Sequence, residues 1–257
     1  MSATVAFDDH LRAIGAATGR MTAAALAAGP DAPVPTCPEW TVADLLAHQG
    51  MVHRWAHAHI TATEPPFADV DAVLAEVDPD ELPEWLAEGS DELVDALSAA
   101  PADLDAFVFI ETGRTPLEFW ARRQAHETTI HALDAISAAR GEIPPPTAMG
   151  VTPAFAADGL DELVVSFLSR GRSKLYDGAP FRIVIAPDDT DHAWTLRVTE
   201  SALTAERELD DYAEVWWSGA AAALYAGLWN RGGDITTARG DAAVLENWHS
   251  RHRIRGR

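Results

Sequence analysis

The segment from Thr115 to about Ala139 constrains the fold most, because it predicts one long helix that carries several reactive groups. Thr115 can cap this helix, the proline after it suits the first helical position, and Glu118 completes a capping box. Glu127 and His131 are four residues apart and therefore share one face of the helix. A carboxylate and an imidazole aligned in this way make either half of a metal site or a hydrogen-bonded pair, and the spacing alone leaves both open.

The same segment contains a pattern that resembles a zinc-protease helix but does not have its geometry. In that motif, two histidines four residues apart bind one ion. Here His126 and His131 are five residues apart, which places them about 140° apart around a straight helix. The two histidines cannot bind one ion together, so the protease interpretation is excluded. Asp134 stays on the face of His131, where it either orients a ligand or lies on the helix surface.

Length and composition indicate an ordered globular protein with two modest domains. The chain has 257 residues, 47% of them hydrophobic, and this length is sufficient for two separate cores. The formal net charge is −21, from 19 basic and 40 acidic residues. This charge argues against nucleic acid and anionic membranes as partners, because both present negative phosphates.

The cysteine count and the N-terminal residues favour a cytoplasmic protein. Cys37 is the single cysteine, which excludes an internal disulfide and fits a reducing compartment. The N-terminal stretch contains Asp8 and Asp9 and has no apolar core of the signal-peptide kind. No window approaches the roughly 18 consecutive apolar residues of a membrane span.

Four helices are expected in the first part of the chain, over residues 4–28, 41–61, 83–100 and 115–139. Apolar residues recur at helical spacing in each, and Gly29 and Thr41 mark the end of the first and the start of the second. Four helices with connections of varied length make a bundle. Bundles build metal sites from side chains on facing helices.

The second helix supplies the best third candidate for a metal ligand. His48 lies in a stripe at steps of three and four residues with Leu45, Val52, Trp55 and His59. We therefore expect His48 to point into the protein, where it can complete a three-ligand site. His53 and His57 form a separate pair on another face, which is a rival metal motif in principle but which we expect to be solvated surface.

Gly141–Thr147, reading GEIPPPT, is a stiff linker that divides a helical domain over 1–143 from a second domain over 150–257. In the second domain, the sequence pattern predicts helices over 153–168, 220–229 and 242–248. It also predicts strands over 181–186, 194–198 and 213–217 and an extended piece near 235–238. Strands and helices separated in this way are typical of an α+β domain. The expected fold class is thus α plus α+β.

Two runs in the first domain resemble the mycothiol-dependent maleylpyruvate isomerase family, which belongs to the DinB-like metal-binding four-helix bundles. They are TCPEWTVADLLAHQGMVHRWA (Thr36–Ala56) and AHETTIHALDA (Ala125–Ala135). The resemblance extends to the second domain, which is similar to the sterol-carrier-like C-terminal module of the family. That match is carried by LYAGLWNRGG (Leu224–Gly233) and RGDAAVLENW (Arg239–Trp248).

The resemblance implies a function and a set of site residues. It implies that a divalent metal, expected to be zinc, is held by His48, Glu127 and His131. Mycothiol would lose its proton at this metal and add to an electrophilic small molecule, as in an isomerase of the maleylpyruvate type or an S-transferase. The family also places an essential arginine in the C-terminal domain, for which Arg231 is the first choice and Arg239 the second.

The remaining candidates are a supporting carboxylate and an alternative class of protein. Asp134 would orient a ligand or the thiol, and Cys37 is expected to be inert packing, so the reactive sulfur comes from outside the chain. The alternative is a non-catalytic module that binds a metal or an apolar ligand, suggested by Trp216, Trp217 and Trp229. The sequence gives no indication of the oligomeric state.

Overall fold

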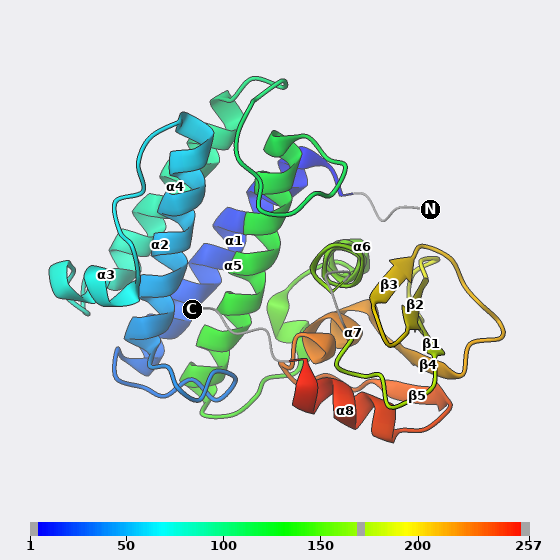
Figure 1. Ribbon diagram of the computed structural model, residues 1–257. Helices are drawn as coiled ribbons and strands as arrows, with labels where there is room; N and C mark the ends of the chain where they lie inside the picture. The colour runs from blue at the N-terminus through cyan, green and yellow to red at the C-terminus, as the bar shows by residue number, and fades with distance from the viewer. Residues whose placement is uncertain (1–4, 169–172, 253–257) are drawn as a thin grey trace. The chain divides into compact units, whose positions relative to one another are not determined.

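The computed structural model describes residues 5–168 and 173–252, and these form a helical unit and an α+β unit (Figure 1). The helical unit comprises Ala6–Pro144, and the α+β unit begins at Pro145. The predicted fold class, helices followed by an α+β part, is confirmed. That 1–143 and 150–257 fold as independent domains stays a prediction.

The helical unit is a bundle of four long helices with one short helix beside them. Its elements are α1 (Phe7–Ala28), α2 (Val42–Thr61), α3 (Val70–Glu76), α4 (Leu82–Ala99) and α5 (Pro116–Arg140). Helix α1 packs along α5 and α4, and α2 packs against α4, α5 and α3. Helix α3 lies between the second and third predicted helices, where the sequence predicted no helix, because seven residues are too few to show helical periodicity.

The two helices that carry the candidate site begin at their capping residues. Thr41 and Asp44 form a capping box at the start of α2, and Thr115 and Glu118 form one at the start of α5. Helix α5 ends at Gly141, which has a φ of 68° that favours glycine. These signals fix where each helix begins, and they therefore fix which residues share a face along it.

The core of the bundle consists of aliphatic side chains from all its long helices. Those with at most 2% exposure include Ile14, Met21, Leu45, Leu46, Leu86, Leu93 and Leu133. Gly50 of α2 allows α4 to come close, because a Cβ at this position would lie 2.2 Å from the ring of Trp85. The contact between α2 and α4 therefore depends on the absence of a side chain at Gly50.

The α+β unit is built on a five-stranded mixed sheet in the order β3-β2-β1-β4-β5. Strands β1 and β4 are parallel, and the other neighbouring pairs are antiparallel. The strands are β1 (Phe181–Pro187), β2 (Trp194–Val198), β3 (Leu203–Glu206), β4 (Val215–Gly219) and β5 (Thr236–Arg239). Strand β3 is an edge strand that the sequence did not predict.

The helices of this unit are α6 (Pro153–Asp161), α7 (Ala221–Leu228) and α8 (Ala243–Arg251). The helix expected over 153–168 is α-helical only to Asp161 and continues as a π-helical segment over Glu162–Phe167. A tight turn follows α7. Gly233 in this turn has a φ of +106°, and a Cβ there would lie 2.3 Å from the carbonyl oxygen of Ala223.

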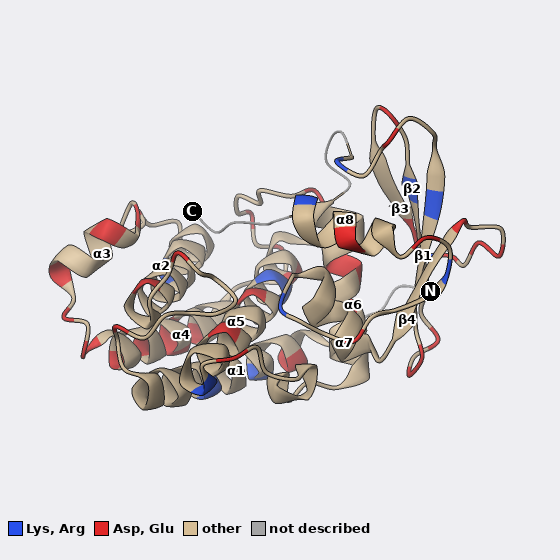
Figure 2. Cartoon of the chain, turned by 90° about the horizontal axis from the view of Figure 1, so that it is seen from below, with Lys and Arg blue, Asp and Glu red and all other residues tan. Residues whose placement is uncertain are grey.

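Acidic side chains are distributed along both units, whereas basic side chains are few (Figure 2). This distribution agrees with the net charge of −21. Among the described residues, none of the helices combines the length and the apolar character needed to cross a membrane.

Candidate metal centre

His48, Glu127 and His131 lie together in the bundle, the first on α2 and the other two on α5. Oε1 of Glu127 is 3.2 Å from Nε2 of His131 and 3.7 Å from Nε2 of His48. One potential ligand atom from each residue lies within 4.8 Å of the other two. The histidine side chains are 5% and 7% exposed, and that of Glu127 is 25% exposed. The three groups are close enough to share one ion, and their role as metal ligands stays a prediction.

His48 is the member of this cluster whose bonding is incomplete. It is buried, yet neither of its ring nitrogens has a hydrogen-bond partner among the described residues. The 3.7 Å to Glu127 is too long for a hydrogen bond. Burial lowers the pKa of His48, so the ring is neutral at pH 7. A buried neutral imidazole without partners has the state required of a metal ligand.

Asp134 orients His131. Its Oδ2 lies 2.9 Å from Nδ1 of His131, and its side chain is fully buried. Nδ1 therefore carries a hydrogen toward Asp134, and Nε2 faces Glu127. Burial alone would lower the pKa of His131, but the hydrogen bonds with Asp134 and Glu127 outweigh it and raise the pKa to about 9. Without a metal, His131 is consequently a cation at pH 7.

Two residues of the loop before α2 also contact this group. The ring of Trp40 lies with its centroid 4.9 Å from that of His48 and 5.9 Å from that of His131. Sγ of Cys37 is 3.6 Å from Oδ2 of Asp134. The loop therefore packs over the two imidazoles and donates a weak hydrogen bond to the carboxylate behind them.

Arg123 is a site residue that the sequence reasoning missed. Its Nη2 lies 2.6 Å from Oε2 of Glu127, and its side chain is 3% exposed. Burial alone would raise the pKa of Glu127, but the charge of Arg123, the hydrogen bond from His131 and the nearby ring of His48 lower it well below 4.5. Glu127 is thus ionised. The spacing of four residues between Arg123 and Glu127 was a signal that could have identified this pair.

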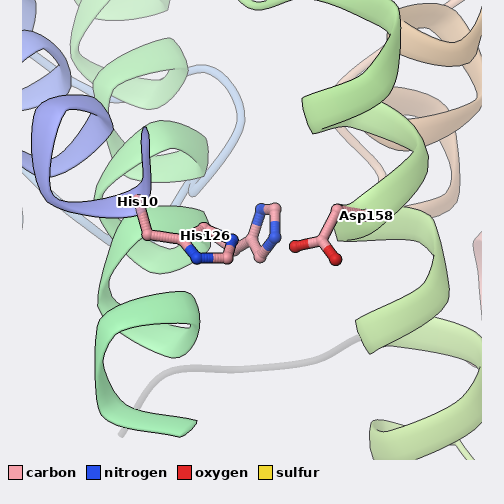
Figure 3. A group of neighbouring side chains, drawn as sticks. All are labelled: His10, His126 and Asp158. Carbon is pink, nitrogen blue, oxygen red and sulfur yellow. The ribbon is translucent and has the colours of Figure 1, made fainter. Parts of the chain in front are cut away.

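His126 belongs to a different face of α5 from His131. Its ring lies 5.9 Å, centroid to centroid, from that of His10 on α1 (Figure 3). Asp158, drawn in the same view, is a residue of α6 in the α+β unit. The separation of His126 from His131 agrees with the exclusion of the zinc-protease motif.

The prediction of a solvated His53–His57 pair is wrong for His53, which is fully buried. Its Nε2 lies 2.9 Å from Oγ1 of Thr128 on α5, which also accepts a hydrogen bond from Gln49 and donates one to the carbonyl oxygen of Gln124. Burial lowers the pKa of His53 to about 3, so this ring is neutral. The physical reason is a polar partner on the facing helix, which a surface stripe on α2 alone does not reveal.

The predicted arginines lie in the α+β unit, and their catalytic role stays a prediction. Arg231 is buried in the turn after α7, where Nη1 donates to the carbonyl oxygen of Trp229 at 2.8 Å. Arg239 on β5 stacks over the ring of Trp216 at 4.7 Å and donates to the carbonyl oxygen of Asp211. Each guanidinium is therefore held by contacts within this unit.

Comparison with known proteins gives a family match for the bundle and two similar crystal structures. Residues 11–136 match the family described as mycothiol maleylpyruvate isomerase N-terminal domain. A crystal structure of the mycothiol-dependent maleylpyruvate isomerase matches with a TM-score of 0.62 and 16% identity, covering 93% of this chain and 95% of that chain. A variant of that protein with one histidine replaced by alanine matches with a TM-score of 0.61, 15% identity and the same coverage. No match was found among curated proteins.

The fold is a four-helix bundle followed by an α+β unit, and the bundle brings His48, Glu127 and His131 together. Residues 11–136 of the bundle are identified by this match as a mycothiol maleylpyruvate isomerase N-terminal domain.

Proposed function

We propose that this protein is a metal-dependent enzyme that activates mycothiol for addition to an electrophilic small molecule, as an isomerase of the maleylpyruvate type or as an S-transferase. The observation that carries the proposal is the convergence of His48, Glu127 and His131, in which buried His48 has no hydrogen-bond partner among the described residues. The family of the bundle and the two similar crystal structures support mycothiol as the thiol.

The donor set suits a divalent ion such as zinc. Two imidazole nitrogens and one carboxylate oxygen are a common ligand set of catalytic zinc, which keeps a further position for substrate. His48 is neutral, Glu127 is ionised, and Asp134 fixes the tautomer of His131 that turns Nε2 toward Glu127. A divalent ion held there would lower the pKa of a coordinating thiol below its ordinary value of about 8.5.

The two reactions share their first step. The sulfur of the thiolate forms a bond to one carbon of a conjugated cis double bond, and the displaced electron pair moves to the conjugated carbonyl oxygen. In the isomerase, rotation about the new single bond is followed by return of the electron pair and breakage of the C–S bond, which gives the trans product and the thiolate. In an S-transferase the C–S bond remains, and the product takes up a proton. In both, a cation near the oxygens stabilises the negative charge; Arg231 is our first assignment for it and Arg239 the second.

The test measures metal content and thiol chemistry separately. We expect the wild type to bind one equivalent of zinc and His48→Ala to lose it, with His57→Ala as a matched control on the same helix. Isomerisation of maleylpyruvate with mycothiol, and conjugation of mycothiol to monobromobimane, in which the thiolate sulfur displaces bromide, are then followed before and after removal of the metal. We expect at least one of the two reactions to require both the metal and mycothiol. A wild type that takes up no metal refutes the proposal, and one that takes up metal but catalyses neither reaction is a non-catalytic binding module instead.

A further inference from the structure

The two carboxylate oxygens of Glu127 have different partners. Oε1 faces Nε2 of His131 at 3.2 Å and Nε2 of His48 at 3.7 Å. Oε2 accepts a hydrogen bond from Arg123 at 2.6 Å. Oε1 therefore makes the contacts with the two imidazoles, and Oε2 makes the contact with the guanidinium.

The contact between Arg123 and Glu127 is strong and well placed to hold this orientation. Both residues lie one turn apart on α5, a helix of 25 residues, and the Arg123 side chain is 3% exposed. A charge-assisted hydrogen bond of this length is among the stronger ones in proteins, and a guanidinium keeps its charge at any working pH. Rotating the carboxylate so that Oε2 approaches the two imidazoles would break this hydrogen bond and leave the buried side chain of Arg123 without it.

A carboxylate can bind a divalent ion through one oxygen or through both, and the second mode uses an additional coordination position. Catalytic sites differ from structural ones by keeping such a position for water or substrate. We infer that Arg123 is a positioning residue that reserves Oε1 of Glu127 for the ion and withholds Oε2, so that a position remains for the thiol. This inference rests on the proposed function of the cluster.

The test uses cobalt, whose visible absorption reports on its coordination. Arg123→Met removes the donor, and Arg123→Lys keeps a cation that donates from a single point. Arg54→Met is the matched control, because Arg54 on α2 is also partly buried and bonded within the bundle, donating to the carbonyl oxygen of Trp85 at 2.9 Å. Each full-length protein is loaded with one equivalent of Co²⁺, its spectrum is recorded, and mycothiol is titrated into it.

In Arg123→Met we expect Co²⁺ to remain bound with a weaker visible absorption, as the released carboxylate oxygen raises the coordination number. Mycothiol should bind about tenfold more weakly or worse, the size of effect typical of residues that orient a ligand. Arg54→Met should keep the wild-type spectrum and thiol affinity. If Arg123→Met does not fold, as judged by circular dichroism, Arg123→Lys carries the test, with a smaller change expected in both quantities.

The inference is overturned if the folded variant at position 123 has the spectrum and mycothiol affinity of the wild type. A different result identifies failure of the proposed function, because a wild type that binds no Co²⁺ shows that the cluster is not a metal site. Failure of this inference is therefore seen in the variant at position 123, whereas failure of the proposed function is seen in the wild type.

Discussion

Binding of a divalent ion to the cluster should release about one proton at pH 7, and that proton should come from His131. Without metal, the pKa of His131 is raised to about 9 by its bonds to Asp134 and Glu127, whereas burial keeps His48 neutral. A ligand nitrogen must be deprotonated to bind. Two pKa units above pH 7 correspond to about 2.7 kcal/mol, so binding at pH 7 should be about 100-fold weaker than when His131 is neutral.

The sign of the pH dependence follows from this proton. Because the metal-free protein holds one proton more than the loaded protein, raising the pH favours the loaded form. The affinity should increase about tenfold per pH unit between about pH 7 and 8.5 and level off above the pKa of His131. Asp134→Asn removes an anionic partner that raises this pKa, so the variant should release less than one proton and show a shallower dependence.

The assay is titration calorimetry with zinc in buffers of different ionisation enthalpy, which gives the number of protons released. Competition with a chelator across the same pH range gives the affinities. His57→Ala, a change outside the cluster on α2, should release as many protons as the wild type. A proton count near zero, with an affinity independent of pH, would refute the assignment of His131 as the charged group in the metal-free site.

Three further predictions concern stability. In the metal-free protein the pKa of His131 is about 9 in the folded state, above its unfolded value of 6.5. The residue should therefore add on the order of 3 kcal/mol to the free energy of unfolding below about pH 6.5, and this contribution is lost as the pH rises through 9. Urea unfolding at both ends of this pH range checks the prediction, and equal stabilities would contradict it. Gly50→Ala should lower the free energy of unfolding by about 1–3 kcal/mol, because the Cβ would meet Trp85 at 2.2 Å; an unchanged melting temperature would show that the ring moves freely. Gly233→Ala should cost about as much or more, since its Cβ would meet the carbonyl oxygen of Ala223 at 2.3 Å at a φ of +106°, and the melting curve would again decide.

The sequence predicted elements well where a local signal marks their ends. Capping boxes at Thr41 and Thr115 placed α2 and α5 to within one or two residues. The sequence did not predict short elements that form only through contacts with adjacent helices or strands. Helix α3 has seven residues, and β3 is a four-residue edge strand whose residues after Leu203 are all at least partly exposed. A short edge strand is defined by its ladder to the next strand, which no local pattern records.

The candidate site was predictable to the extent that its residues share a helix. Glu127, His131 and Asp134 follow one face of α5, and their mutual contacts follow from that spacing. The contact between Cys37 and Asp134 joins residues 97 positions apart, and it depends on how the loop before α2 packs on α5. Contacts of this kind come from the tertiary fold and have no periodic signal.

His53 shows why a single apolar stripe underestimates what a helix buries. Helix α2 packs against both α4 and α5, so its buried arc includes His48 and also His53, which lies five residues and about 140° further around. Burial alone therefore does not distinguish a metal ligand from a histidine of the core. Bonding does: Nε2 of His53 is bonded to Thr128, whereas neither nitrogen of His48 has a hydrogen-bond partner within the part of the chain that the structure describes. The histidine that lacks hydrogen-bond partners is also the one near Glu127, and for this reason we propose His48, and not its buried neighbour His53, as the metal ligand.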